Sequence, residues 1–248
     1  PRSTLFPYTT LFRSYGVKIG PERHAEAHVR SLETMLDTIA ASGPLAAPRP
    51  PEKRYVCVCR SFALLMVALL HSQNVPARTR CGFGTYFETG RGYDHWVAEY
   101  WNKTEKRWVL VDAQIDDRQR RMFGIAIDTL DVPRDRFLVA GDAWRLCRAG
   151  KADPTSFGIL EMWGWWFIAS NIVRDVAALN GRAMLPWDCW GMMTRDDRQL
   201  DGAFLDRLAE LTHAPDAHRD KLRALQNDPR LAVPHTVFNA VLNRPEAA

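Results

Sequence analysis

One segment of the chain leaves little freedom in how the protein can fold. The nine residues Phe62–Leu70 are all apolar, and most of them favour helix. A helix that is apolar on nearly every side must be buried, usually against a sheet. A run of this length is too short to span a membrane, which needs about 18–20 residues. We therefore expect Cys59–Leu70 to form a core helix.

A cysteine, Cys59, stands where this helix would begin. The first turn of a helix carries unpaired N–H groups and the positive end of the helix dipole. Both stabilise a thiolate, which is the reactive form of cysteine, and Arg60 adds a positive charge next door. A buried, inert cysteine is a common alternative. The segment by itself leaves both interpretations open.

Composition narrows the classes of protein to consider. The chain has 248 residues, 46% hydrophobic and 25% charged, which suits one large domain or a domain with an extension. The net charge of +4 is small and dispersed, so we expect no nucleic-acid partner and no membrane partner. Five cysteines do not suggest a disulfide scaffold. They favour a reducing compartment, and we predict a cytoplasmic location.

The first residues do not resemble the rest of the chain. Residues 1–14 resemble the in-frame translation of a DNA-sequencing adapter, and no initiator methionine precedes them. We therefore expect them to be an artefact and exclude them from the fold. On this interpretation, the native N-terminus and any signal peptide lie outside the sequence.

An amphipathic helix is predicted over residues 21–42. Pro21 suits its first turn, and apolar residues recur at Leu32, Met35, Leu36 and Ile39. His24 and His28 lie four residues apart on it, which is a spacing that metal ligands use. Because no third ligand is near in the sequence, we favour a solvated face for both histidines.

Three strands are predicted after the core helix. They cover Ala77–Glu88, Tyr93–Trp101 and Arg107–Ala113, and the polar residues Asn102–Lys106 should join the last two as an antiparallel hairpin. A turn centred between residues 103 and 104 would pair Val97 with Leu110 and His95 with Asp112. Side chains on one face recur every second residue, so these four would share a face.

This register brings two polar groups together. Directly paired residues have Cβ atoms about 4.5–5.5 Å apart, which allows a hydrogen bond between the His95 imidazole and the Asp112 carboxylate. A slip of one residue would place them on opposite faces.

The second half of the chain is predicted to be mainly helical. Asp116–Arg121 is expected to be a solvated loop and Phe137–Ala140 an edge strand. Phe157–Asn180 is expected to be a helix, and we interpret the aromatic cluster Met162–Phe167 as packing on the core rather than as a wall of a cleft. A further amphipathic helix follows at Leu200–Leu211.

Acyl transfer needs three different chemical roles, which could be taken by Cys59, His95 and Asp112. The thiolate would attack an acyl carbon, the imidazole would take and return the proton, and the carboxylate would orient the imidazole. A cysteine alone is weak support. A cysteine before an apolar helix, with a histidine and an aspartate at matched hairpin positions, is stronger.

These residues lie in segments that resemble the transglutaminase-like superfamily, whose members are papain-like thiol enzymes. The resemblance covers roughly residues 50–120 and rests on the segments Cys59–Leu65, Val75–Arg78, Asp94–Tyr100 and Trp108–Ala113. It implies that Cys59 is the nucleophile, His95 the base and Asp112 the orienting acid. The stretch from Val132 to Trp190 resembles the helical extension of an uncharacterised bacterial branch of the family.

The sequence departs from the family pattern at two positions. Cys57 stands where the family often has glycine, and Ser61 stands where an acidic residue often follows the arginine. Cys57 raises the question of which thiol reacts, and we favour Cys59 because it is nearer the helix start. The backbone N–H of Cys59 is the default donor to an oxyanion.

The resemblance implies an α+β fold, with a nucleophile helix packed on an antiparallel sheet. We predict a transglutaminase-like catalytic core over residues 15–140 and a helical, Trp-rich extension over residues 141–248. No cofactor and no bound metal are expected.

The predicted function is a thiol acyl hydrolase or acyltransferase acting on a peptide or glutamine-type amide bond of a protein or peptide. One alternative is a catalytically inactive binding module that keeps the fold. A third interpretation is a metal site made of Cys57, Cys59, Cys81 and His95, although this would leave Asp112 without a role.

Overall fold

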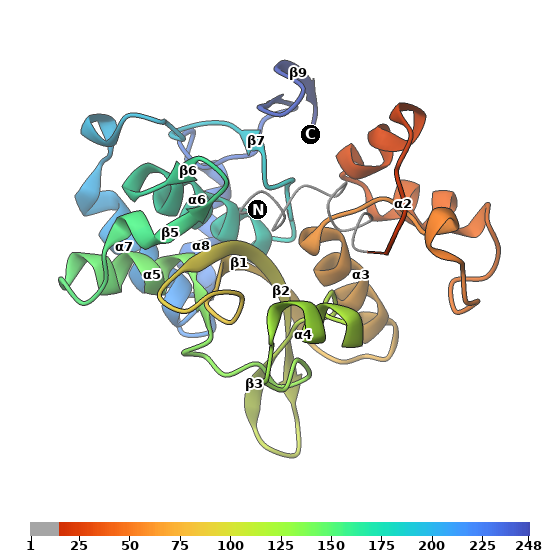
Figure 1. Ribbon diagram of the computed structural model, residues 1–248. Coiled ribbons are helices and arrows are strands. Elements are labelled where there is room, and N and C mark those ends of the chain that lie inside the picture. The colour runs from red at the N-terminus through yellow and green to blue at the C-terminus, as the bar shows by residue number, and fades with distance from the viewer. Residues whose placement is uncertain (1–14) are drawn as a thin grey trace.

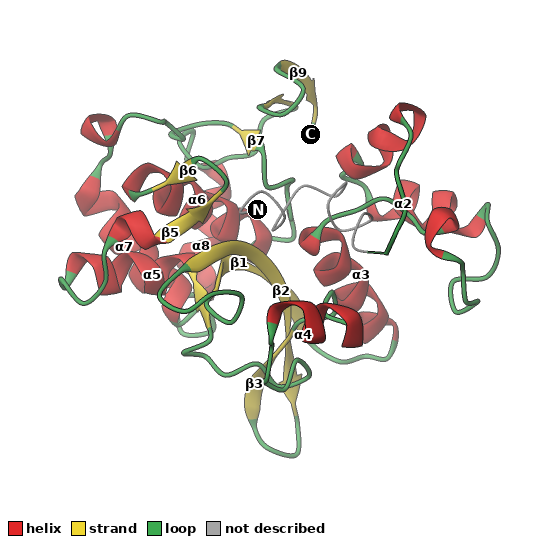
Figure 2. Cartoon of the chain, in the orientation of Figure 1, coloured by secondary structure: helices red, strands yellow, loops and turns green. Residues whose placement is uncertain are grey.

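The computed structural model describes residues 15–248 as a mixed α and β arrangement, with helices on both sides of a central sheet (Figures 1 and 2). The predicted adapter segment, residues 1–14, lies outside the described residues. The α-helices are α2 (Leu32–Ala40), α3 (Cys59–Ser72), α4 (Asp117–Phe123), α5 (Ala140–Arg148), α6 (Trp165–Leu179), α7 (Gly202–His213) and α8 (Arg219–Ala224). Short 3₁₀ helices are η2 (Pro21–His28), η3 (Pro51–Lys53), η4 (Pro154–Ser156), η5 (Asp197–Gln199) and η6 (Leu225–Asn227).

The strands form two sheets. They are β1 (Ala77–Gly84), β2 (Gly92–Asn102), β3 (Arg107–Val111), β4 (Phe137–Val139), β5 (Phe157–Ile159), β6 (Met162–Trp163), β7 (Asp188–Cys189), β8 (Thr236–Asn239) and β9 (Arg244–Ala247). In the larger sheet, β2 pairs antiparallel with β1 and β3 and parallel with β5, so the sheet is mixed rather than wholly antiparallel. β4 pairs with β1 at the edge, as predicted. β7, β8 and β9 form the smaller sheet.

The apolar helix α3 packs on β1 and β2, as its composition requires. Ala63 from the helix shares a buried cluster with Cys81 of β1 and Trp96 of β2. Among residues 15–248, no helix combines the length and the apolar character that crossing a bilayer requires.

In the view of Figure 1 the C-terminal helices lie to the left of the sheet and α3 to its right, and α6 meets α3 in a buried cluster that contains Ala178 and Ala63. α5 and α6 pack on β1, and α7 packs on both helices. Phe83 of β1 shares the largest core cluster with Ile168 and Ile172 of α6 and with Leu205 and Leu208 of α7. The helical extension is therefore part of a continuous core with the sheet.

A buried charge network joins α6 to this sheet. Arg80 of β1 binds Asp175 of α6 at 2.8 Å and Glu99 of β2 at 3.2 Å, and all three side chains are at most 1% exposed. Asp175 also accepts the backbone N–H of Cys81 at 2.9 Å. Burial disfavours the charges, but Arg80, Arg78 and Arg134 together lower the pKa of Glu99 to about 2. Glu99 is thus ionised, and the ion pairs of Arg80 hold α6 on the strands.

The helix predicted over residues 21–42 is interrupted. A 3₁₀ helix ends at His28, and α2 begins at Leu32 with Ser31 as its N-cap. The guanidinium of Arg60 binds the carbonyl oxygens of Val29 and Arg30 at 3.3 and 2.6 Å. In a continuous helix these two carbonyl groups would accept hydrogen bonds from the helix itself. The prediction of one helix over residues 21–42 was therefore wrong between His28 and Leu32.

The β2–β3 hairpin forms with a register two residues away from the predicted one. Trp101 pairs with Trp108, and Asn102 pairs with Arg107. The turn is centred between residues 104 and 105 rather than between 103 and 104, and the Asn102 side chain accepts the N–H groups of Thr104 and Glu105 at 3.0 and 3.1 Å. Side chains alternate with a period of two, so this shift leaves every residue on its predicted face.

Three other boundaries differ from the sequence prediction. β1 ends at Gly84, where the next N–H donates to Arg136 O. The predicted solvated loop at residues 116–121 is mostly helix α4, which Asp116 caps. The predicted helix Phe157–Asn180 starts only at Trp165, because its first residues form the β5–β6 hairpin.

Removing Asp175 should reveal how much the fold depends on the buried network. Asp175→Ala leaves Arg80 buried with only part of its charge compensation, and we expect a loss of about 3–5 kcal/mol in the free energy of unfolding, measured with urea. Arg107→Ala breaks ion pairs at the surface and should leave that free energy nearly unchanged. Similar losses in the two variants would contradict the role given to the network.

Candidate active site

Helix α3 places Cys59 at its first residue. Val58 is the N-cap in an extended conformation, with no side-chain hydrogen bond to the helix. Cys59 is 4% exposed and therefore lies just below the surface. Its backbone thus belongs to the first turn of the helix, as the sequence predicted.

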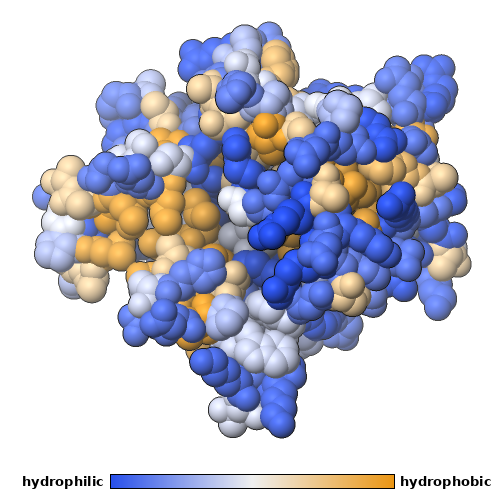
Figure 3. Space-filling model, turned by 180° about the vertical axis from the view of Figure 1, so that it is seen from behind, coloured by the Kyte–Doolittle hydropathy of each residue, from blue (hydrophilic) through white to orange (hydrophobic). Residues whose placement is uncertain are grey.

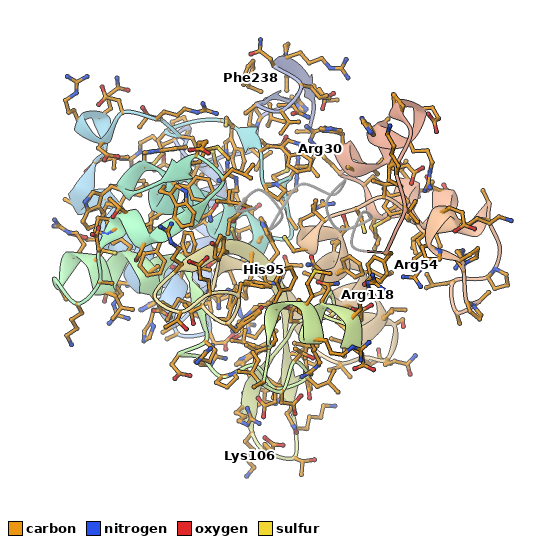
Figure 4. All side chains as sticks on the ribbon, viewed as in Figure 1. Arg30, Arg54, His95, Lys106, Arg118 and Phe238 are labelled. Atoms are coloured by element: carbon orange, nitrogen blue, oxygen red, sulfur yellow. The ribbon has the colours of Figure 1, made fainter. Side chains whose placement is uncertain are left out.

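His95 of β2 and Asp112, the residue after β3, are joined by a hydrogen bond. His95 Nε2 lies 2.8 Å from Asp112 Oδ2, and both side chains are almost fully buried. Figure 4 shows His95 near the centre of the molecule, between Lys106 at the hairpin tip and Phe238 on β8. The structure thus brings the predicted pair together, because the two-residue shift kept both residues on one face.

The thiol of Cys59 lies close enough to the His95 ring to contribute to the raised pKa of the imidazole. Because Asp112 occupies Nε2, Nδ1 is the ring nitrogen that remains for an interaction with the thiol. The structure therefore brings the three residues selected from the sequence into one neighbourhood, with a hydrogen bond between His95 and Asp112.

Two partners of Asp112 were not recognised in the sequence. The hydroxyl of Tyr86 donates to Oδ2 at 2.6 Å, and the backbone N–H of Gln114 donates to Oδ1 at 3.0 Å. Tyr86 was assigned to a strand by alternation, whereas it lies in the loop after β1. No local pattern indicated that this loop folds back over Asp112.

Aromatic rings enclose the imidazole. Phe87, Tyr86 and Phe137 lie edge-on to His95, with ring centroids 5.1, 6.1 and 6.5 Å away. They exclude water from the His95–Asp112 pair, which strengthens the electrostatic interaction between the two residues.

The electrostatics of the site favour a charged imidazole. Burial alone would lower the pKa of His95, but the Asp112 charge and hydrogen bond, with a smaller contribution from Cys59, raise it to about 10. An imidazolium next to a thiol is the arrangement that favours a thiolate.

The other buried cysteines lack this environment. Burial, with a contribution from Cys59, raises the pKa of Cys57 to about 12, and burial raises the pKa of Cys147 to about 11. Burial also raises the pKa of Cys81 well above its ordinary value. All three favour the neutral thiol at pH 7, which supports the preference for Cys59 over Cys57.

A pocket of about 550 Å³ opens beside Cys59. Its lining includes Met162, Trp166 and Phe167. These residues also pack on the core, so the packing interpretation of the aromatic cluster was correct but incomplete. A larger pocket of about 700 Å³ lies beside Cys57 and is lined by none of the three proposed triad residues.

One of the two N-terminal histidines, His28, contradicts the prediction of a solvated face. His28 is buried rather than solvated, and its Nδ1 lies 3.1 Å from Trp187 Nε1 and 2.9 Å from Asn239 Nδ2. The solvated-face prediction was wrong for His28 because residues distant in sequence cover it. In the part of the chain that the structure describes, no group of three or more His, Cys, Asp or Glu side chains is arranged to hold a metal ion.

Comparison with known families agrees with this geometry. Residues 24–113 match the family model described as the transglutaminase-like superfamily, and this segment contains Cys59, His95 and Asp112. No curated protein and no solved structure gave a significant match to the chain. The resemblance drawn from the sequence is thus confirmed for this segment.

The raised pKa of His95 has a consequence for stability. The pKa of the His95 imidazole is about 10 in the folded protein and has its ordinary value of 6.5 in the unfolded chain. The folded protein therefore binds this proton more tightly. Its stabilising contribution is full below about pH 6.5 and is lost as the pH rises through about 10. We therefore expect the free energy of unfolding to fall over this range by more in the unaltered protein than in His95→Gln.

Urea unfolding at a series of pH values measures this difference. Asp112→Asn provides a control, because it keeps the imidazole and removes the charge that raises its pKa, so the fall should be smaller and should end at lower pH. Identical pH dependence in all three proteins would show that His95 does not carry the effect.

Proposed function

With residues 24–113 in the transglutaminase-like superfamily, we propose that the protein is a thiol acyl hydrolase or acyltransferase acting on an amide bond. The amide is of the peptide or glutamine type, and the reaction passes through a thioester on Cys59. One observation carries the proposal: His95 is hydrogen-bonded to the Asp112 carboxylate at 2.8 Å, and Cys59 lies near enough to contribute to the raised pKa of its imidazole.

In the first half of the reaction, the Cys59 thiolate attacks the carbonyl carbon of the amide and forms a C–S bond. The carbonyl oxygen becomes an oxyanion, to which the backbone N–H of Cys59 can donate. The protonated imidazole of His95 gives its proton to the amide nitrogen, the C–N bond breaks, and the amine leaves. The products of this half are a thioester and a neutral imidazole.

In the second half, His95 takes a proton from water or from an amine, and the oxygen or nitrogen attacks the thioester carbon. The C–S bond then breaks and returns the thiolate beside an imidazolium. Asp112 holds Nε2 throughout, which keeps Nδ1 directed at the sulfur and the acceptor. Tyr86 and Gln114 in turn hold Asp112.

Two observations weigh against the alternative, a catalytically inactive binding module. The His95 ring faces Cys59 rather than turning away, and the aromatic residues near α6 line the pocket without filling it. An inactive module has no requirement for a buried imidazole–carboxylate pair directed at a thiol.

We further propose that residues 15–140 form the catalytic core and residues 141–248 form its helical, Trp-rich extension. The start of α5 at Ala140, directly after edge strand β4, supports this division. The absence of disulfides among the five cysteines agrees with the proposed cytoplasmic location.

Labelling with iodoacetamide tests the identity of the nucleophile. At pH 7 we expect Cys59 to react faster than the same thiol in denaturant, with the site identified by mass spectrometry. Cys59→Ala should abolish this fast labelling, whereas the matched variant Cys57→Ala should retain it. Labelling of Cys59 no faster than in the denatured chain would refute the proposed thiolate.

Turnover of a panel of peptide amides, with and without hydroxylamine as acceptor, tests the reaction. Cys59→Ala should be inactive, and His95→Gln should be slower by about 10²–10⁴-fold because it removes the proton-transfer group. A free acid as the product indicates hydrolysis, and a hydroxamate indicates transfer. Undiminished turnover by Cys59→Ala would contradict the proposal.

A further inference from the structure

The pocket beside Cys59 has a buried polar end, and its exposed lining combines apolar side chains with Arg195 and Asn243. At its deep end lie Cys59, Asp94 and Arg174, each at most 5% exposed. The walls between floor and rim are large apolar side chains: Ile159, Met162, Trp166, Phe167, Pro186 and Met193. A ligand that reaches Cys59 must therefore pass through a largely apolar space.

Two hairpins from distant parts of the chain supply the rim. Leu160, at the turn between β5 and β6, is 46% exposed and has a positive φ of 52°, which is uncommon for leucine. Phe238 and Val241, in the β8–β9 hairpin, are 43% and 55% exposed. Single exposed apolar residues are common on protein surfaces. The face of the molecule drawn in Figure 3 also shows several hydrophobic patches. Three such residues at one pocket mouth indicate a binding surface.

The floor contains an unused hydrogen-bond donor. Arg174 Nη1 donates to Asn171 Oδ1 at 2.8 Å, and Nη2 donates to the carbonyl oxygen of Asp188 at 3.1 Å. The Nε–H of the same guanidinium is buried and has no hydrogen-bond partner among residues 15–248. A buried donor without an acceptor is costly, so a ligand that supplies one is favoured.

The carboxyl group of Asp94 already lies near the positive charge of Arg174. The ligand atom that accepts from Arg174 Nε–H therefore need not be charged. Asp94 lies close enough to Arg174 for the guanidinium to oppose the rise that burial causes in the pKa of Asp94. Asn171 bridges the two, because its Nδ2 donates to Asp94 Oδ1 at 2.8 Å. The remaining donor therefore suits a neutral carbonyl oxygen better than a second carboxylate.

We infer that this pocket binds a peptide with a large apolar side chain next to the reacting amide, and that Arg174 Nε–H donates to a backbone carbonyl oxygen of that peptide. The inference rests on the proposed function, since it takes Cys59 as the reacting group. A glutamine side chain has only two methylene groups and would leave most of the apolar wall uncovered. The structure thus favours an apolar peptide over a glutamine side chain as acyl donor.

Binding to Cys59→Ala tests this without turnover. Capped peptides that differ only in Phe or Gly before the central amide are titrated by calorimetry, together with a capped glutamine peptide. We expect the Phe peptide to bind at least about tenfold more tightly than the other two. Equal binding of the three peptides, or a preference for glutamine, would overturn the inference.

Rim variants in the same background show whether the preference comes from this pocket. Leu160→Ser and Phe238→Ser are exposed substitutions, and each should reduce the preference for Phe several-fold. Leu130→Ser is the matched control, because Leu130 is 65% exposed but does not line the pocket. An unchanged preference in both rim variants, or an equal loss in the control, would place the binding surface elsewhere.

The role of Arg174 is tested by changing the acceptor on the ligand. A Phe peptide with the proposed carbonyl reduced to methylene should bind about tenfold more weakly to Cys59→Ala. In Cys59→Ala/Arg174→Lys the two peptides should differ much less, and thermal unfolding verifies that this variant folds. A carbonyl effect that is unaltered in the lysine variant would exclude the Nε–H contact.

Failure of the inference is distinguishable from failure of the proposed function. If Cys59 proves unreactive, the reaction is wrong, but binding to Cys59→Ala still reports on the pocket. If Cys59 is reactive and the peptides bind equally, the reaction stands and the substrate class is wrong.

Discussion

The buried ion pair between Arg80 and Asp175 is the interaction on which the arrangement of the site depends. It fixes helix α6 on strand β1, and through Glu99 it also ties in β2. Asp175 additionally holds the backbone of Cys81, so the helix is positioned against the strand backbone as well as against a side chain. A buried charge tolerates little displacement from its partner, because separation would leave both groups desolvated.

The position of α6 matters because the helix forms one wall of the pocket. Trp166, Ser170 and Arg174 lie four residues apart along it and all line the pocket. Asp175, the next residue after Arg174, carries the ion pair. Arg174 and the anchor Asp175 therefore belong to the same turn of helix, and the pocket is built on a rigid element next to Cys59.

The candidate site combines two kinds of positioning. Cys59 is placed by the start of a buried helix, and His95 and Asp112 by neighbouring strands, so backbone hydrogen bonds hold all three elements. Tyr86 and Gln114 then fix the carboxylate, and aromatic rings enclose the imidazole. The result is a pair in a low-dielectric environment, in which an imidazolium is favoured.

Periodic patterns in the sequence determined much of this. The apolar run after Cys59 indicated a buried helix, and alternation in the two strands placed His95 and Asp112 on one face even though the predicted register was two residues off. Such patterns are readable because helix and strand repeats are local properties of the chain. Only the tertiary structure decided the break before α2, the Tyr86 contact and the pocket wall from α6. Each of these depends on contacts between residues far apart in sequence, for which a single chain carries no local signal.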